Sequence, residues 1–438
     1  MSDTIPAAKP APKGAPDTIS PERAPHLFVP LRWFLLGLFY LLTLLLVSIW
    51  KAPMLAADYL HNPATLAVTH LFTLGFGGSV VTGAIYQLVP VMLYSRLRSE
   101  RLANWHLVLH GAGVAAMVTG FLLFQPLWVA SGGTAVLTGA LLFVGNLIAT
   151  FRAVERPNWH GNFVAGAIVF YLSTLIWGLI MAFNQRYGFW GEVEGAKLSF
   201  HLTLGLLGWF GLMVVGVGMK LIPMFAPGKS LPVWLVTAVG GGYTGGVLLM
   251  LAGLFWRAPV LWTGIGFVGL ALLGYSGAVV YSLIRRRPGP LDLSVRYGVT
   301  AAVLLLLPLL LFFPAGRQLR AGLVFLFALG WIGSTMLGML LRIIPFMVWL
   351  HRFRNRLTKT EKIPFLHETF QRHWGVIAYY TWFPGITLMA AGIGFGVEWL
   401  ITGGAVVTLL GMGAFGWAMR QVLHHIKPGT PALFPGKK

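Results

Sequence analysis

The stretch VTHLFTLGFGGSVVTGAIYQLVPVM, residues 68–92, recurs in altered form at two later places in the chain. It is long, apolar and rich in glycine, as expected of a helix that spans a membrane. It also holds His70 near its start, and a histidine inside lipid-embedded sequence is costly unless a partner binds it. The stretch therefore bears on both the fold of the protein and the chemistry of His70.

The composition of the chain points to a membrane. Of its 438 residues, 57% are hydrophobic and only 10% are charged, a balance that soluble domains of this size do not tolerate. The absence of cysteine excludes disulfides, zinc–thiolate sites, iron–sulfur clusters and c-type haem attachment. Twelve apolar segments are near or above the ~20 residues that cross a bilayer as a helix: 31–50, 66–93, 105–125, 127–151, 161–183, 198–226, 231–255, 259–284, 296–313, 319–350, 373–396 and 399–422. The sequence therefore predicts an all-α polytopic membrane protein.

The second, sixth and tenth of these segments share three glycines and a proline at the spacing G-x2-G-x4-G-x6-P. The positions are Gly75, Gly78, Gly83 and Pro90; Gly208, Gly211, Gly216 and Pro223; and Gly330, Gly333, Gly338 and Pro345. An aromatic residue follows each first glycine, and a polar residue stands three positions before each proline: Phe76, Trp209 and Trp331, and Gln87, Lys220 and Arg342. Close helix packing explains abundant glycine but not one spacing in three places. The recurrence predicts three four-helix units, at about 31–152, 159–287 and 295–425.

The basic residues indicate how the chain lies in the membrane. The net charge of +20 is carried mainly by short loops, with 24 Lys and Arg on the side of the two termini and six on the other side. This asymmetry follows the positive-inside rule and places both termini in the cytoplasm; it does not resemble a nucleic-acid-binding face. Residues 1–30 are rich in Pro and Ala and are predicted to be a disordered cytoplasmic tail, residues 31–425 a single membrane domain, and residues 426–438 a second tail.

The three glycine-patterned helices resemble those of subunit I of the haem-copper oxidase and nitric-oxide reductase superfamily, most closely the cbb-type oxidases. "ALGWIGSTMLGMLLRIIPFMVW" is similar to the tenth helix of that family, and "LGFGGSVVTGAIYQLVP" to its second. The resemblance implies a bacterial cytoplasmic membrane protein whose second, sixth and tenth helices carry cofactor ligands. The chain departs from the family, however, where the tenth-helix H-x-H becomes Leu323 and Phe325 and the seventh-helix histidine pair is missing. We therefore expect no copper and no reduction of oxygen or nitric oxide by the family mechanism.

Two histidines lie just inside the outer face: His70, 20 residues before Pro90, and His201, 22 residues before Pro223. Their depths differ by only ~3 Å, but their directions around equivalent helices differ by ~200°. In the family that the chain resembles, a side chain 20 residues before the proline points to the next repeat, and one 22 residues before it points to the previous repeat. The resemblance thus implies that His70 and His201 converge between the first and second repeats.

Two neutral imidazoles at matched depth suit a low-spin, six-coordinate b-type haem with bis-histidine ligation. Each ring would direct its other N–H to a carbonyl or hydroxyl group. The candidate partners of the haem propionates are Lys197, Arg186 and His61. Two alternatives remain open: the histidines bind another metal or cofactor, or each is satisfied by hydrogen bonds within the bundle.

Other polar residues allow more than one interpretation. His106 and His110 form an H-x3-H on one helical face, which suits either a metal site or packing at the cytoplasmic interface. Lys220 and Arg342 either extend to that interface or line a path for protons or an anion. Tyr243 is expected to be a packing residue.

A bis-histidine haem has no open coordination position, so it predicts electron transfer and not gas activation. We expect a haem b subunit of a respiratory complex that is not itself an enzyme. It would lie among membrane lipids and work with other subunits, a periplasmic cytochrome or a quinone. A role in haem- or copper-related transport, sensing or assembly, and a cofactor-free structural role, are the alternatives.

Overall fold

The computed structural model describes residues 23–57, 62–92, 95–152, 159–192, 195–226, 230–286, 288–353 and 366–426. Within these ranges all regular secondary structure is helical and no residue is in a β-strand. Twelve helices in them are long and apolar enough to cross a membrane. The protein is therefore an all-α polytopic membrane protein, as its composition predicts.

The described spans agree closely with the apolar segments of the sequence. They are α1 (Phe28–Trp50); α3 (Pro63–His70) with η2 (Leu71–Gly78) and α4 (Ser79–Met92); α5 (Glu100–Leu122); α6 (Pro126–Phe151); α7 (Trp159–Tyr187); α8 (Ala196–Leu202) with η3 (Thr203–Gly211) and α9 (Leu212–Phe225); α10 (Val233–Gly253); α11 (Ala258–Ile284); α12 (Leu293–Leu304) with α13 (Leu306–Leu311); α14 (Arg317–Phe325) with η4 (Leu326–Gly333) and α15 (Ser334–Phe353); α16 (Arg372–Phe395); and α17 (Glu398–His424). Two short helices, α2 (Ala52–Ala56) and η6 (Leu366–Glu368), lie in connections.

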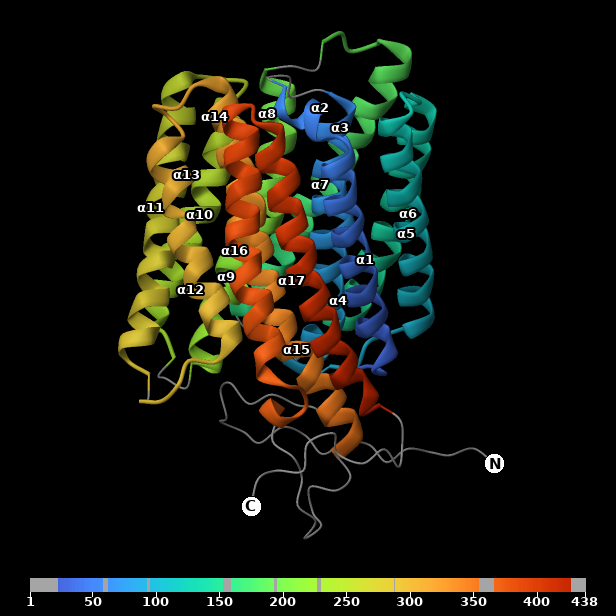
Figure 1. Cartoon of the computed structure of the whole chain (residues 1–438). Helices are drawn as coiled ribbons and strands as arrows, with labels where there is room; N and C mark the ends of the chain where they lie inside the picture. Colours follow the sequence, from blue (N-terminus) through green and yellow to red (C-terminus); the bar gives the residue numbers. More distant parts are fainter. Residues whose placement is uncertain are drawn as a thin grey trace.

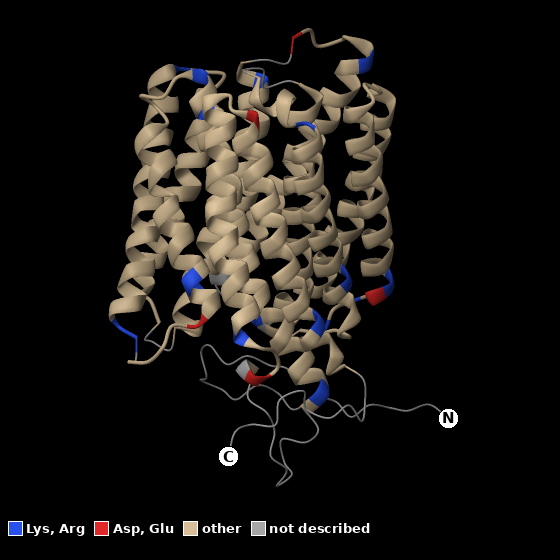
Figure 2. Ribbon diagram, in the orientation of Figure 1, with Lys and Arg blue, Asp and Glu red and all other residues tan. Residues whose placement is uncertain are grey.

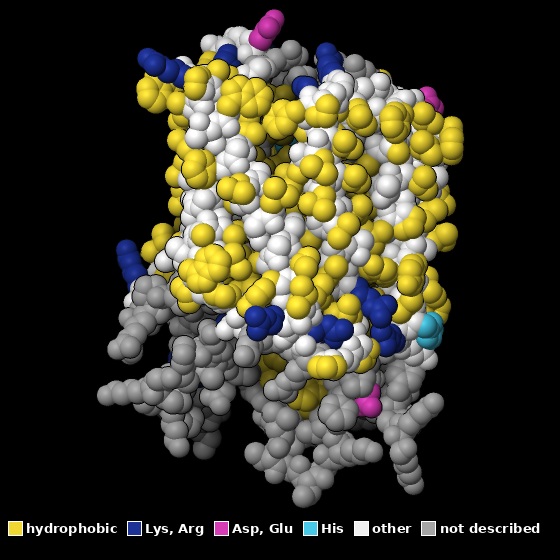
Figure 3. Space-filling model, turned by 90° about the vertical axis from the view of Figure 1, so that its left-hand side faces the viewer, with side chains coloured by type: hydrophobic (Ala, Val, Ile, Leu, Met, Phe, Trp, Pro, Cys, Tyr) yellow, Lys and Arg dark blue, Asp and Glu magenta, His cyan; other side chains and the backbone are white. Residues whose placement is uncertain are grey.

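The spans run side by side as one bundle, and α1 begins at the end of the bundle where α17 finishes (Figure 1). Charged residues gather at the two ends (Figure 2), and hydrophobic side chains cover the middle of the face seen in Figure 3. Large apolar side chains such as Phe39, Leu270 and Leu410 are more than half exposed, as expected where helices face lipid.

The predicted terminal tails lie mostly outside the described residues. Positions 1–22 and 427–438 are not described, and positions 28–30 of the predicted first tail are already part of α1. The membrane domain therefore begins at Phe28 in the structure, slightly earlier than position 31.

Each glycine-patterned span contains a π-helical segment at the same position. η2, η3 and η4 end at Gly78, Gly211 and Gly333, the second glycines of the pattern, which all lie twelve residues before the repeat proline. Because π-helical turns are rare, three of them in one register support the prediction of three four-helix repeats.

The third glycine of each pattern receives a bulky side chain from the first helix of the same repeat. A Cβ on Gly83 would lie 2.8 Å from Phe34 of α1, and one on Gly216 would lie 2.6 Å from Phe163 of α7. A Cβ on Gly338 would likewise collide with Tyr297 of α12. The conserved spacing within the chain is therefore a packing requirement between the first and second helices of each repeat.

The third helix of each repeat supports one carbonyl of the π-helical segment, directly in two repeats and through a serine in the third. His110 Nε2 donates to the Leu74 carbonyl oxygen (3.0 Å), and the Tyr243 hydroxyl donates to the Leu207 carbonyl oxygen (2.9 Å). In the third repeat, Trp382 Nε1 donates to Ser334 Oγ (2.7 Å), which donates to the Leu329 carbonyl oxygen (3.0 Å). The three carbonyls lie at the same position, one residue before the first glycine.

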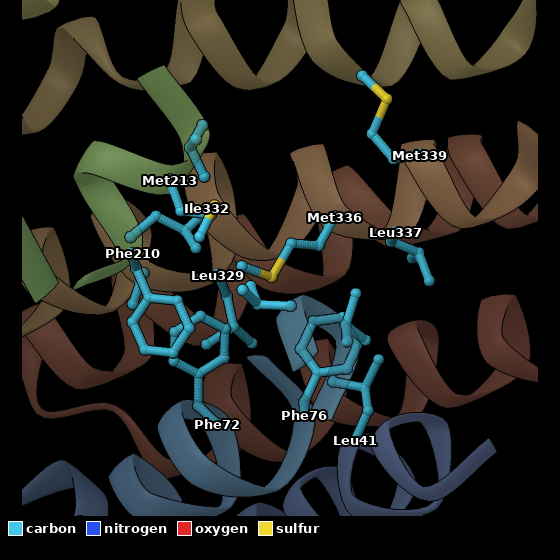
Figure 4. Packing of buried hydrophobic residues seen from close by; sticks show 14 of the residues in the cluster. Leu41, Phe72, Phe76, Phe210, Met213, Leu329, Ile332, Met336, Leu337 and Met339 are labelled. Atoms are coloured by element: carbon cyan, nitrogen blue, oxygen red, sulfur yellow. The ribbon is translucent and has the colours of Figure 1, made fainter. Parts of the chain in front are cut away.

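The three π-helical segments contact one another at the centre of the bundle. Phe72 of η2 and Phe210 of η3 pack with ring centroids 6.1 Å apart, and Figure 4 shows them beside Leu329 and Ile332 of η4. Gly333 admits the edge of Phe72, since a Cβ there would lie 3.2 Å from that ring. The second helices of the repeats thus form the core around which the others are arranged.

The glycine packing predicts that a glycine-to-alanine substitution changes the stability of the protein differently at two sites. Gly83→Ala should destabilise the protein by about 1–3 kcal/mol because the added methyl group collides with Phe34. Gly266→Ala in α11, where a Cβ would meet nothing within 4 Å, should leave stability unchanged or raise it by up to about 1 kcal/mol. Thermal midpoints of the detergent-solubilised proteins measure both effects. An unchanged midpoint for Gly83→Ala would contradict the packing role.

Candidate functional site

His70 is the last residue of α3, directly before the π-helical segment η2. Its Nδ1 lies 2.7 Å from the Leu66 carbonyl oxygen. Because a carbonyl oxygen only accepts, Nδ1 carries the proton and Nε2 of the neutral ring carries the lone pair. The ring also packs on Phe121 of α5, with centroids 4.8 Å apart. This half-buried imidazole is oriented as metal-binding histidines are, with one nitrogen held by a carbonyl and the other available.

His201 lies on α8, two residues before η3. Its ring rests against α7 at Gly178, where a Cβ would lie 2.8 Å from His201 Cε1. The Thr174 carbonyl is near the ring, but His201 Nδ1 is buried without a hydrogen-bond partner among the described residues. The lack of a side chain at Gly178 therefore gives the imidazole room beside the α7 backbone.

His70 and His201 lie close enough that a proton on one ring would disfavour a proton on the other. The helices that carry them, α3 and α8, lie at the same end of the bundle, opposite the start of α1 (Figure 1). Binding of one haem by both histidines stays a prediction. The Leu66 hydrogen bond fits binding of a haem iron by His70, whereas Nδ1 of His201 has no hydrogen-bond partner among the described residues.

Lys197 has a role in the loop between α7 and α8 that the sequence did not indicate. Its Nζ donates to the carbonyl oxygens of Trp190 (2.6 Å) and Glu192 (2.8 Å), and it lies 5.0 Å from the centre of the Trp190 ring. It stands one helical turn before His201. Two of its three N–H groups thus hold the loop, and one remains for another acceptor.

The other two predicted propionate partners do not join this group in the described structure. The Arg186 guanidinium stacks on the neighbouring Tyr187 ring at 5.5 Å, and both side chains are exposed. His61 lies outside the described residues.

His106 and His110 lie inside the bundle and are not solvated. Both are 0% exposed, and their ring centroids lie 5.8 Å apart. The Tyr86 hydroxyl is 3.2 Å from His106 Nδ1. A signal for this burial exists in the sequence, because both histidines follow the helical spacing of apolar or small residues on the buried face of α5: Ala103, Gly113, Val114 and Met117.

The polar residues before the repeat prolines differ in environment. Arg342 Nη1 forms a 3.0 Å ion pair with Asp292, the N-cap residue of α12, and its guanidinium lies 5.4 Å from the Phe225 ring centre. Since α12 begins at the end of the bundle that holds the start of α1, the Arg342 side chain extends toward that end, as expected for a residue that reaches the interface.

Lys220 lines a cavity of about 100 Å³ at the centre of the bundle. The other lining residues are almost all apolar and come from α4, α7, α9 and α15, among them Ile85, Val164, Met213 and Met336. Neither His70 nor His201 lines it. The cavity and the predicted haem site are therefore separate features.

In comparisons with known proteins, no family model and no curated protein matches the sequence. These comparisons do not bear on the resemblance to oxidase subunit I, and the functional argument rests on the side chains described above.

Lys197 and Arg186 should respond differently to truncation. Lys197→Ala removes two charge-assisted hydrogen bonds to the loop, each contributing of order 1 kcal/mol, and should speed amide hydrogen exchange in residues 188–192. Arg186→Ala, at an exposed position, should leave exchange in that loop unchanged. Equal exchange rates in the two variants would show that Lys197 does not hold the loop.

Proposed function

We propose that the protein is a haem b-binding membrane protein that transfers electrons within a respiratory complex and is not itself an oxygen or nitric-oxide reductase. The observation that carries the proposal is the state of His70: Leu66 fixes its Nδ1–H and leaves the lone pair on Nε2. His201 stands at nearly the same depth on the equivalent helix, close enough that a charge on one ring would be felt by the other.

His70 and His201 would hold the haem iron through one ring nitrogen each. When bound, a bis-histidine haem b supplies reversible one-electron transfer at iron and has no open position for a gas. The Leu66 carbonyl would keep the His70 ring from rotating, and Gly178 would leave the His201 ring its place against α7. The remaining N–H of Lys197, one turn from His201, is the best-placed donor for a propionate among the residues predicted for this role.

The location and partners follow from charge and distance. The basic end of the bundle, where α1 begins, would face the cytoplasm, in a bacterial cytoplasmic membrane. The histidines would then lie near the outer face, and one haem there cannot carry electrons across ~30 Å of hydrocarbon. The protein would therefore need another subunit, a periplasmic cytochrome or a quinone as redox partner.

The central cavity favours a second candidate function. A chamber of about 100 Å³ with an apolar lining stabilises water poorly and suits a small apolar molecule. In a sensing or transport role the cavity would bind the small molecule, and haem would then report or regulate that binding.

Absorption spectra of the detergent-purified protein test the first proposal. The reduced-minus-oxidised spectrum should show the bands of low-spin haem b, and both His70→Ala and His201→Ala should abolish them. His373→Ala, at an exposed position on α16, is the matched control and should retain them.

The outcomes separate the candidates. A colourless protein without metal would refute haem binding and favour a structural role. A haem spectrum that survives His201→Ala would refute the pairing of the two histidines while haem binding itself stood. High-spin bands that respond to nitric oxide would favour sensing over electron transfer.

A further inference from the structure

The three repeats provide an internal comparison for the buried histidines of α5. His110, Tyr243 and Trp382 occupy equivalent places. His110 and Tyr243 donate directly to the carbonyl oxygen at the same position of their π-helical segments, and Trp382 does so through Ser334. Four residues earlier on these third helices stand His106, Val239 and Ala378. The first repeat thus has a buried imidazole where the other two have an aliphatic side chain.

The partner of His106 departs from the pattern as well. Tyr86 stands four residues before the repeat proline, where the other repeats have Met219 and Leu341. All three side chains are buried. Two of the three repeats therefore fold with apolar side chains at both positions, so the fold does not require the polar Tyr86–His106 pair.

The two histidines form a closed site within the bundle. Their rings are nearly perpendicular, at 86°, with centroids 5.8 Å apart. The Trp33 ring packs on both imidazoles, with its centroid 4.4 Å from that of His106 and 5.1 Å from that of His110. The Phe143 ring centroid lies 5.2 Å from that of His106. The surroundings are therefore aromatic, and both imidazoles are shielded from solvent.

Each ring has one nitrogen engaged and one without a partner. His106 Nδ1 is beside the Tyr86 hydroxyl, while His106 Nε2 is buried with no hydrogen-bond partner among the described residues. His110 Nε2 donates to the Leu74 carbonyl, so its unpartnered, buried Nδ1 carries a lone pair. One nitrogen oriented by a second group and the other unused is the arrangement of metal-binding histidines.

We propose that His106 and His110 bind one Cu(I) ion, at a site separate from the predicted haem. Two imidazoles that share an ion about 2 Å from each bound nitrogen have centroids about 6 Å apart, close to the observed spacing. Two neutral nitrogens with no carboxylate among their described contacts disfavour a divalent ion, because its charge would stay uncompensated in an apolar site. A monovalent ion that accepts imidazole and few ligands meets both conditions, and Trp33 adds a cation–π contact.

The expectation that copper is absent concerned other positions. It was drawn from the missing ligands on the seventh and tenth helices, whereas this site lies on α5. The proposal does not depend on haem binding.

Anaerobic titration of the purified protein with Cu(I), in competition with a chromogenic Cu(I) chelator, tests the site. We expect one tightly bound ion per chain, with an X-ray absorption edge typical of two nitrogen ligands. His106→Val and His110→Tyr place in the first repeat the residues that the second repeat uses, so the fold should be retained. Each should weaken binding by more than the 10–100-fold that loss of an outer partner costs.

Two further variants complete the test. Tyr86→Phe keeps both imidazoles and should weaken binding by about 10-fold, and exposed His373→Ala should bind as the native protein does. The haem spectrum, where present, should be the same in His106→Val, which distinguishes this site from that of His70 and His201. Absence of Cu(I) binding by the native protein, or unchanged affinity in His106→Val with an unchanged thermal midpoint, would overturn the proposal.

Discussion

The structure depends on one constraint: a backbone carbonyl inside a bilayer needs a hydrogen-bond donor. Each second helix of a repeat widens into a π-helical segment whose carbonyl at one fixed position accepts a hydrogen bond from a side chain. In the first two repeats that side chain comes from the third helix of the repeat, and in the third repeat it is Ser334 of α15, which is itself held by Trp382 of α16. The donors differ, an imidazole from His110, a phenol from Tyr243 and an indole acting through Ser334 from Trp382. The position is preserved while the chemistry varies, which indicates that the fold selects for a donor there and not for a particular residue.

The glycines complete this arrangement. Those of the pattern let the first helix of a repeat approach the second, and Gly77 and Gly333 let phenylalanine rings pass between second helices at the centre. All three spans contain a π-helical segment that ends at the second glycine, eight residues long in η2 and η4 and nine in η3. His70 stands directly before η2, and His201 stands two residues before η3.

The features predicted from the sequence were those carried by long patterns. The twelve apolar segments correctly predicted the all-α membrane fold. The glycine pattern that recurs in every fourth span predicted the repeats. Each of these signals involves many residues. The π-helical segments were not predicted, because their dihedral angles differ little from those of an α-helix and the sequence has no known signal for them. The burial of His106 was missed for a related reason: its depth was judged from distance along the chain, whereas it depends on which helices cover α5. The loop contacts of Lys197 depend on carbonyls, which no side-chain pattern reveals.

The pseudo-symmetry offers a criterion for separating structural from functional polar residues in this bundle. A polar side chain that has polar counterparts in the other repeats, as His110 does, is explained by the fold. One whose counterparts are apolar is not: His106 corresponds to Val239 and Ala378, and His201 corresponds to Val68 and Leu323. His70 lies between these cases, since Thr203 and Phe325 occupy its position. Burial of an imidazole costs free energy that an aliphatic side chain would not. His106 is fully buried and His201 is half-buried with a buried Nδ1, so at both positions the sequence retains a cost that its own repeats avoid. Binding of an ion or cofactor is the simplest explanation for that cost. It would occur at His106 and His201, the two positions where a histidine replaces the apolar residue of the other repeats.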